Sequence, residues 1–159
     1  MFTTTSVNWS RNMHRSISYL VFNIAMLVSL SALAGTNTGK CTPQLAQSAM
    51  DNVDEIRSWG TLNLYYKRYR NCDDGSISEG VSEAIARLLV DRIESIPDLE
   101  KYLIGDPKFN DYIVSHINST LNTDDLQSIK TMKIRAGSRI LLKLRRKLSD
   151  AAMESLKSQ

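Results

Sequence analysis

Residues 71–80, with the sequence NCDDGSISEG, decide how the rest of this chain folds. Asp74-Gly75 predicts a turn, because glycine tolerates positive φ and an aspartate side chain can bond its own backbone. Ser76 and Glu79 have the spacing of a capping box, in which two side chains satisfy the free amides of a helix start. The stretch therefore predicts a chain reversal followed at once by a helix.

Apolar residues after this turn recur at steps of three and four, which is the spacing of a helix face. They are Ile77, Val81, Ile85, Leu88, Leu89, Ile93 and Ile96. Thr42-Pro43 and Asp106-Pro107 each predict another helix start, with a capping residue followed by proline. No stretch alternates with period two for long enough to predict a strand. We therefore expect an all-α fold, a compact array of five to seven short helices.

The first 34 residues contain no acidic residue and have the three parts of a secretory signal peptide. Arg11, His14 and Arg15 precede an apolar run over residues 17–34, which ends in Ala-Leu-Ala. Met13 is an alternative start, and a retained membrane anchor is an alternative to cleavage. We expect residues 1–34 to be removed and residues 35–159 to form a single helical domain.

The exported domain would carry two cysteines, Cys41 and Cys72. In an oxidising compartment a disulfide between them is the default expectation, although two free thiols remain an alternative. The bridge would close a loop of about 30 residues and stabilise the fold by roughly 3–4 kcal/mol. Without Arg11 and Arg15 the chain has 18 basic and 17 acidic groups, so net charge implies no partner.

Two groups of residues are candidates for contact with a partner. Tyrosine and arginine are enriched at the energetic centres of protein interfaces, and the first group is Tyr65, Tyr66, Arg68 and Arg70. In the competing interpretation Leu62, Tyr65 and Tyr69 pack inward, while Tyr66 and the basic residues face solvent. The second group is the acidic turn, made of Asp73, Asp74 and Glu79.

The acidic turn lacks the register of a calcium-binding loop, so we expect helix capping and solvated charge there, and no metal site. No cofactor is expected either. His116 is the only histidine after residue 34, and motifs such as G-x-S-x-G, H-E-x-x-H and C-x-x-C are absent. The sequence therefore predicts no catalytic residue, although a carboxylate pair that cleaves cell-wall glycan remains an alternative.

Charge is segregated along the chain. Residues 51–125 carry fifteen acidic and eight basic residues, whereas residues 130–147 carry eight basic residues and no acid. The basic residues alternate with Ile140, Leu141, Leu144 and Leu148, which predicts a basic amphipathic helix. It could dock on the acidic part of its own domain, bind an acidic protein, or lie on an anionic membrane. Export argues against nucleic acid as a partner.

Several of these segments together resemble a family of small exported helical proteins of Gram-negative bacteria. They are residues 59–69, 72–75 and 79–80, Asp106-Pro107-Lys108-Phe109, and His116-Ile117. Some proteins of this type are similar to immunity proteins, which neutralise antibacterial toxins in the periplasm. The resemblance covers residues 59–130. Relatives carry another cysteine pair near the C-terminus, where this chain has residues 135–148 instead.

The resemblance implies a periplasmic protein without catalysis of its own, an immunity protein or inhibitor that covers a toxin's active site. Charge complementarity and a few aromatic anchors would provide the recognition. A second hypothesis is an envelope structural or membrane-surface protein that acts through the basic helix of residues 130–147. A third is a carboxylate-dependent cell-wall hydrolase.

Overall fold

The computed structural model describes residues 39–134 and 138–159 of the 159-residue chain. The predicted signal segment, with its alternative start at Met13, lies outside the described residues. The chain divides into two units, Met1–Gly35 and Thr36–Gln159, and the second contains everything described below. Every buried core residue of the described part belongs to this second unit, which therefore has a hydrophobic core of its own.

The described residues form seven α-helices and three short 3₁₀ turns, with no strand among them. The predicted all-α class, with five to seven helices, is confirmed. The helices are α2 (Pro43–Asn52), α3 (Trp59–Tyr69), α4 (Gly75–Val90), α5 (Ile96–Gly105), α6 (Pro107–Ser115), α7 (Thr123–Thr131) and α8 (Arg139–Lys157). The 3₁₀ turns are η1 (Val53–Glu55), η2 (Arg70–Cys72) and η3 (Ile93–Ser95).

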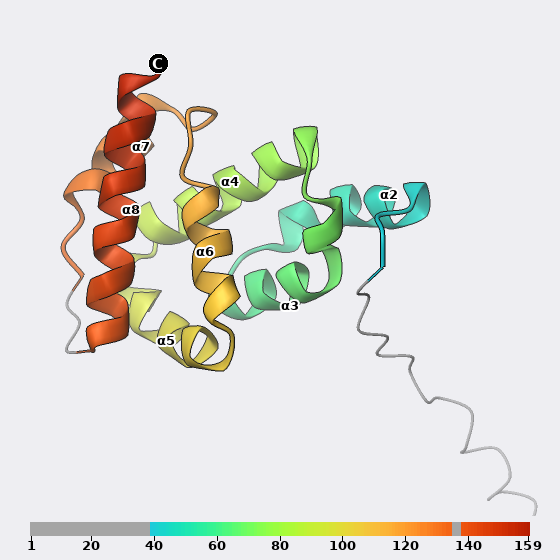
Figure 1. Ribbon diagram of the computed structural model, residues 1–159, viewed down its shortest axis with the longest axis horizontal. Coiled ribbons are helices and arrows are strands. Elements are labelled where there is room, and N and C mark those ends of the chain that lie inside the picture. The colour runs from blue at the N-terminus through green and yellow to red at the C-terminus, as the bar shows by residue number, and fades with distance from the viewer. Residues whose placement is uncertain (1–38, 135–137) are drawn as a thin grey trace, which may run out of the picture. The chain divides into compact units, whose positions relative to one another are not determined.

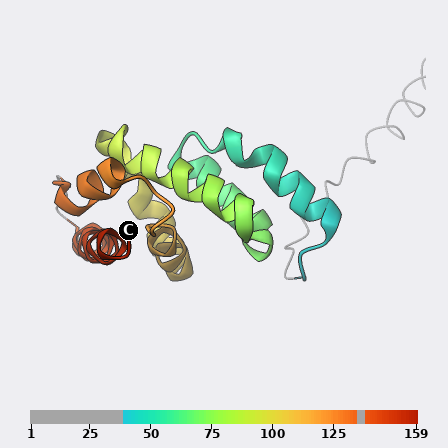
Figure 2. The ribbon, with the colours of Figure 1, turned by 90° about the horizontal axis from the view of Figure 1, so that it is seen from above.

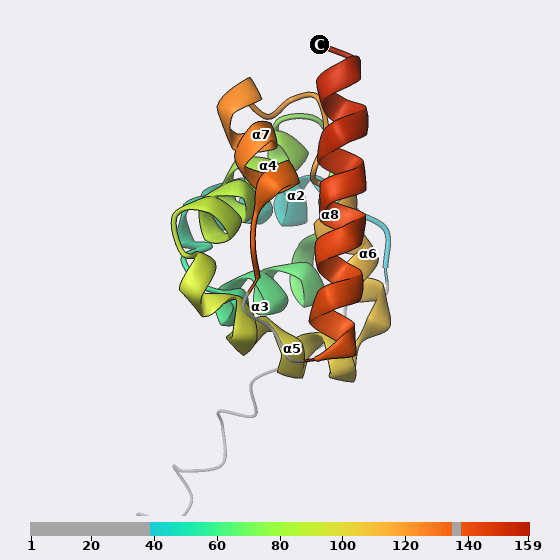
Figure 3. The ribbon, with the colours of Figure 1, turned by 90° about the vertical axis from the view of Figure 1, so that its left-hand side faces the viewer.

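Helix α4 lies at the centre of this unit and contacts both α2 and α7 (Figures 1 and 2). Helix α8 packs along α7 and also contacts α5 and α6, as the view in Figure 3 shows. Ile85 and Leu89 of α4, Phe109 of α6, and Leu144 and Leu148 of α8 are all fully buried. Burying each such side chain stabilises the fold by roughly 1.5–3 kcal/mol. Because α4 contacts helices from both ends of the chain, the core forms around it.

Helix α4 begins with a different capping residue from the one predicted. Asp74 is the N-cap, and its carboxylate accepts a hydrogen bond of 2.8 Å from the Gly75 amide. Gly75 has a φ of +51°, as the Asp-Gly turn predicted. Because Asp74 already reaches the first free amide, the helix begins before Ser76, and the predicted Ser76–Glu79 capping box is wrong.

The end of α4 also comes earlier than the apolar pattern predicted. The helix stops at Val90, and the chain turns through η3, where Ile93 is 38 % exposed. Ile96 is buried, but as the first residue of α5, with Pro97 in the first turn. A proline lacks the amide that a helix interior needs, so its place at a helix start is the favourable one.

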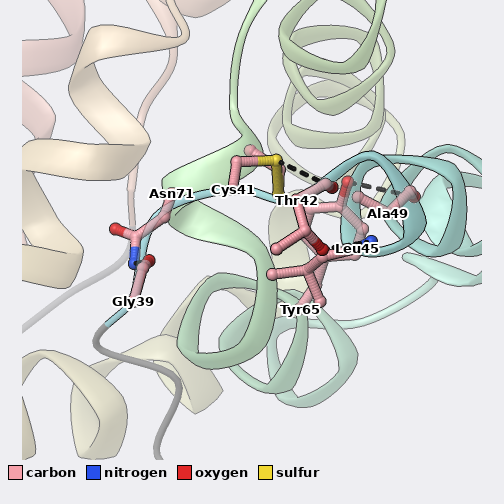
Figure 4. The surroundings of a disulfide bond; sticks show 8 residues. Gly39, Cys41, Thr42, Leu45, Ala49, Tyr65 and Asn71 are labelled. Atoms are coloured by element: carbon pink, nitrogen blue, oxygen red, sulfur yellow. Dashed lines mark hydrogen bonds between the residues drawn. A yellow bond between two sulfur atoms is a disulfide. The ribbon is translucent and has the colours of Figure 1, made fainter.

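The predicted disulfide between Cys41 and Cys72 is confirmed, with Cα atoms 4.9 Å apart (Figure 4). The same two parts of the chain are joined by hydrogen bonds on either side of the bridge. The Asn71 side chain donates to the Gly39 carbonyl at 2.8 Å, and the Tyr65 hydroxyl donates to the Ala49 carbonyl at 3.1 Å. The disulfide therefore joins the start of α2 to the turn that begins α4.

We predict that the double substitution Cys41→Ser and Cys72→Ser lowers the free energy of unfolding by about 3–4 kcal/mol, because the unfolded chain regains the entropy of an open loop. Urea denaturation followed by circular dichroism measures the change. A thiol reductant should lower the stability of the wild type to the same degree and leave the variant unchanged. Equal stability of the oxidised wild type and the variant would contradict the prediction.

Candidate functional site

A chain of polar side chains crosses the core between the start of α4 and the end of α6. The Asp73 carboxylate lies 2.9 Å from His116 Nε2, and His116 Nδ1 lies 3.0 Å from Ser82 Oγ. The Asn118 side chain donates to the same Ser82 oxygen at 3.4 Å. Ser82 is fully buried and His116 is 2 % exposed. Residues more than thirty positions apart thus form one hydrogen-bonded array.

Local structure places each member of this buried polar array. Asp73 follows Cys72, so the disulfide holds its backbone, and Asp74 then fixes the first turn of α4. Ser82 lies about two turns into α4, among its buried positions. His116 is the C-cap residue of α6. The bond between Asp73 and His116 therefore ties the disulfide-bonded turn to α6.

The direction of the hydrogen bonds follows from the donors available. An ionised Asp73 can only accept, so His116 Nε2 donates to it. In a neutral imidazole Nδ1 then accepts from the Ser82 hydroxyl, and the Ser82 oxygen accepts from Asn118. In this protonation state each of the three links has one donor and one acceptor, which is how buried polar groups avoid a desolvation cost.

A serine, a histidine and an aspartate in this order are also the components of a nucleophilic triad. A nucleophile must reach its substrate, however, and Ser82 has no exposed surface. Its oxygen is further covered by the Asn118 amide. In this conformation the array links helices and offers no reactive atom to a ligand.

Aromatic rings pack beside the array. The Tyr112 ring meets the His116 ring edge to face, with centroids 4.5 Å apart. Burial, and next to it the negative charge of Asp73, raises the pKa of the Tyr112 phenol above its ordinary value. The Tyr112 hydroxyl and Asp73 Oδ1 are both buried without a hydrogen-bond partner in the described structure. The Tyr112 ring therefore covers one side of the array, and its hydroxyl lies near enough to Asp73 to be influenced by that charge.

The predicted tyrosine and arginine group is divided between core and surface. Tyr65 and Tyr66 are 4 % and 3 % exposed, so neither ring is available as a surface anchor in this fold. The interpretation that places Tyr66 in solvent is therefore wrong: its ring packs against Phe109 and Tyr112, with centroids 5.1 and 4.8 Å away. Aromatic packing at these separations favours burial over solvation.

The two arginines of that group remain exposed and lie against the same rings. The Arg68 guanidinium lies 5.1 Å from the centre of the Tyr69 ring, and that of Arg70 lies 5.1 Å from the centre of the Tyr66 ring. At this distance a cation is attracted to the face of an aromatic ring. Arg68 and Arg70 thus cover the tyrosines and keep their charges at the surface.

The three residues of the acidic turn have three different surroundings. Asp73 faces the core and holds His116, Asp74 caps α4, and Glu79 is exposed. Glu83, one helical turn beyond Glu79, is exposed as well, although it was not among the residues predicted from the sequence. Its i+4 spacing from Glu79 is the signal that could have found it. Ser82 carried no comparable signal, because a lone serine in an apolar helix face has no predicted partner.

The exposed acidic edge of α4 consists of Asp74, Glu79 and Glu83. In residues 39–134 and 138–159, neither glutamate forms an ion pair with a cation of the chain. Two like charges at i and i+4 destabilise a helix by about 0.2–0.5 kcal/mol. These carboxylates therefore contribute nothing by ion pairing to the stability of the fold, and they are free to meet a partner.

The described part of the chain has neither a metal-binding cluster nor a helix that could span a membrane. No group of three or more His, Cys, Asp or Glu side chains there is arranged to hold a metal ion. None of the helices in residues 39–134 and 138–159 has the length and apolar character that crossing a bilayer requires.

We predict that Ser82→Ala lowers the free energy of unfolding by about 1–3 kcal/mol, because it leaves the buried His116 Nδ1 and the Asn118 amide without their shared partner. Urea denaturation measures the loss. The matched control is Ser76→Ala, which removes an exposed hydroxyl of the same helix and should change stability by less than about 0.5 kcal/mol. Equal effects of the two substitutions would show that the buried array does not stabilise the fold.

A second prediction concerns alkaline pH. Burial raises the pKa of Tyr65, Tyr66 and Tyr112 above the ordinary value of 10.0. Since the unfolded chain releases these protons near pH 10, their contribution to stability is complete below that pH and is lost as pH rises above it. Tyrosinate absorbance at 295 nm should therefore increase for these residues together with loss of the helical circular dichroism signal. Full ionisation near pH 10 with unchanged helix content would contradict this.

Comparison with known proteins assigns no family to the chain. No family model, curated protein or solved structure matches it. What this protein does is therefore inferred from its own residues, above all from the rigid turn at the start of α4 and the charges that follow it.

Proposed function

We propose that this chain is an exported, non-catalytic binding protein, an immunity protein or inhibitor that neutralises an antibacterial toxin in the periplasm. The observation that carries the proposal is the exposed acidic edge of α4, where Glu79 and Glu83 have no cationic partner within the described structure. Such an edge suits a basic surface on the toxin. Charge complementarity of this kind raises association rates and selects the correct partner.

The contacts directly before α4 also support the proposal. The disulfide at Cys72 and the bond from Asp73 to His116 both act directly before α4 begins. The buried face of the helix then packs into the core over its whole length. A surface fixed before binding loses little conformational freedom when the complex forms, which favours affinity.

The disulfide also supports export. Structural disulfides persist in compartments such as the periplasm and are rare in the reducing cytoplasm. The predicted signal segment of residues 1–34 is a second argument, taken from the sequence, for the same compartment. A periplasmic inhibitor needs a fold that remains stable outside the cytoplasm. The bridge between Cys41 and Cys72 would stabilise the fold there.

The test uses the oxidised unit Thr36–Gln159 as bait in an envelope extract from cells that make this protein. We expect one stoichiometric protein partner that remains bound at moderate salt and whose toxicity falls when the two proteins are co-expressed. With the purified partner, the triple variant Asp74→Asn, Glu79→Gln and Glu83→Gln should bind about tenfold to a hundredfold more weakly. Asparagine caps helices as well as aspartate does, so α4 should stay intact.

The matched control removes three exposed carboxylates from η1, η3 and α5, with the variant Asp54→Asn, Glu94→Gln and Asp98→Asn. It changes net charge by the same amount and should bind like the wild type. If both triple variants lose the same affinity, overall charge and not the edge of α4 governs binding. If no protein is captured, or the captured protein is harmless to cells, the inhibitor function is wrong.

A further inference from the structure

Helix α8 has two chemically distinct faces. Leu141, Leu144, Leu148 and Ala152 are buried against the rest of the domain. On the opposite face, the first two turns present only cations and one leucine to solvent: Arg139, Leu142, Lys143 and Arg146 are all exposed. We call these four residues the basic face of α8. Figures 1 and 3 show α8 at an edge of the helical unit, beside α6 and α7.

Docking within the chain does not account for this face. Lys147 pairs with Asp111 at 2.7 Å, and that pairing holds the pKa of the Asp111 carboxyl below its ordinary value. In the described ranges no acidic side chain forms an ion pair with Arg139, Lys143 or Arg146. Lys147 therefore pairs within the fold, and Lys143 adds a weaker attraction to the same exposed Asp111 carboxylate. Arg139 and Arg146 have no ion-pair partner in the described ranges.

The basic face also lies at the unfavourable end of its helix. The N-terminal end of a helix carries a partial positive charge, so anions stabilise it and cations destabilise it. The first turn of α8 contains no acid, and Asp150 and Glu154 come only in its second half. Helix stability alone would favour acidic residues in the first turns of α8 and basic residues in the last turns. Negative charge from outside the chain would offset this cost.

We propose that the basic face of α8 docks this protein on an anionic phospholipid bilayer. The three cations would meet headgroup phosphates, each strengthened by the positive end of the helix. Leu142, which is 41 % exposed among them, would enter the boundary between headgroups and acyl chains. A bilayer of this kind has anionic headgroups at its surface and apolar chains beneath them. The cations around Leu142 suit the headgroups, and the leucine suits the apolar layer.

This membrane contact uses a different helix from the one assigned to the toxin and is independent of that function. The protein could hold the bilayer through α8 while the acidic edge of α4 remains free. Membrane docking would place an inhibitor at the surface where an incoming toxin arrives. Failure of either proposal would leave the other standing, because no residue belongs to both surfaces.

Cosedimentation of the oxidised unit Thr36–Gln159 with vesicles tests the proposal. We expect binding to vesicles of phosphatidylglycerol mixed with phosphatidylcholine, none to phosphatidylcholine alone, and loss of binding in 1 M salt, where screening acts within about 3 Å. The triple variant Arg139→Gln, Lys143→Gln and Arg146→Gln should bind roughly a hundredfold more weakly. Glutamine is a good helix former, and circular dichroism verifies that α8 remains folded.

The control variant Lys67→Gln, Arg87→Gln and Lys108→Gln removes the same charge from exposed positions of other helices and should keep most of the binding. A second variant, Leu142→Ser, should weaken binding several-fold at each salt concentration where the wild type still binds, since it removes apolar contact and leaves charge unchanged. Equal losses in the two triple variants would overturn the proposal, as would wild-type protein that does not bind anionic vesicles.

Discussion

The hydrogen bond between Asp73 and His116 is the contact on which the rest of this structure depends. It joins the turn held by the disulfide to the end of α6, and through Ser82 it reaches the buried face of α4. Breaking one side of such a buried pair leaves the other group unsatisfied at a cost larger than the bond itself contributes. Apolar burial holds α4 in the core, and these polar contacts fix how its first turns, and with them the acidic edge, are oriented.

Local chemistry explains why so much of the fold could be predicted from the sequence. Thr42 and Pro43 begin α2 as expected, Asp106 and Pro107 begin α6, and the Asp74-Gly75 turn has the positive φ that glycine permits. The disulfide followed from two cysteines in a chain expected to be exported. The helix starts and the turn each depend on a few neighbouring residues. Two cysteines allow only one disulfide pairing.

Two errors are local, the Ser76–Glu79 capping box and the end of α4 at Val90. The others concern contacts between residues that are distant in the sequence. Helical spacing alone does not show that Tyr66 is buried, because Phe109 and Tyr112 of α6 are what cover its ring. His116 gave no sign that its partners would be Asp73 and Ser82, which are 43 and 34 residues away. Periodicity shows that a face is apolar; it does not show which helix covers it, and polar partners within a core leave no local pattern.

The most direct test of this account is the state of the His116 ring in solution, measured by multiple-bond ¹H–¹⁵N NMR on the oxidised protein. The structure predicts a ring N–H at Nε2 that exchanges slowly with water, because Asp73 accepts it inside the core. It also predicts that Ser82→Ala alters the Nδ1 signal and leaves the Nε2 proton in place. A ring proton that exchanges as fast as that of a solvent-exposed histidine would show that the array does not exist and that α4 is held by other means.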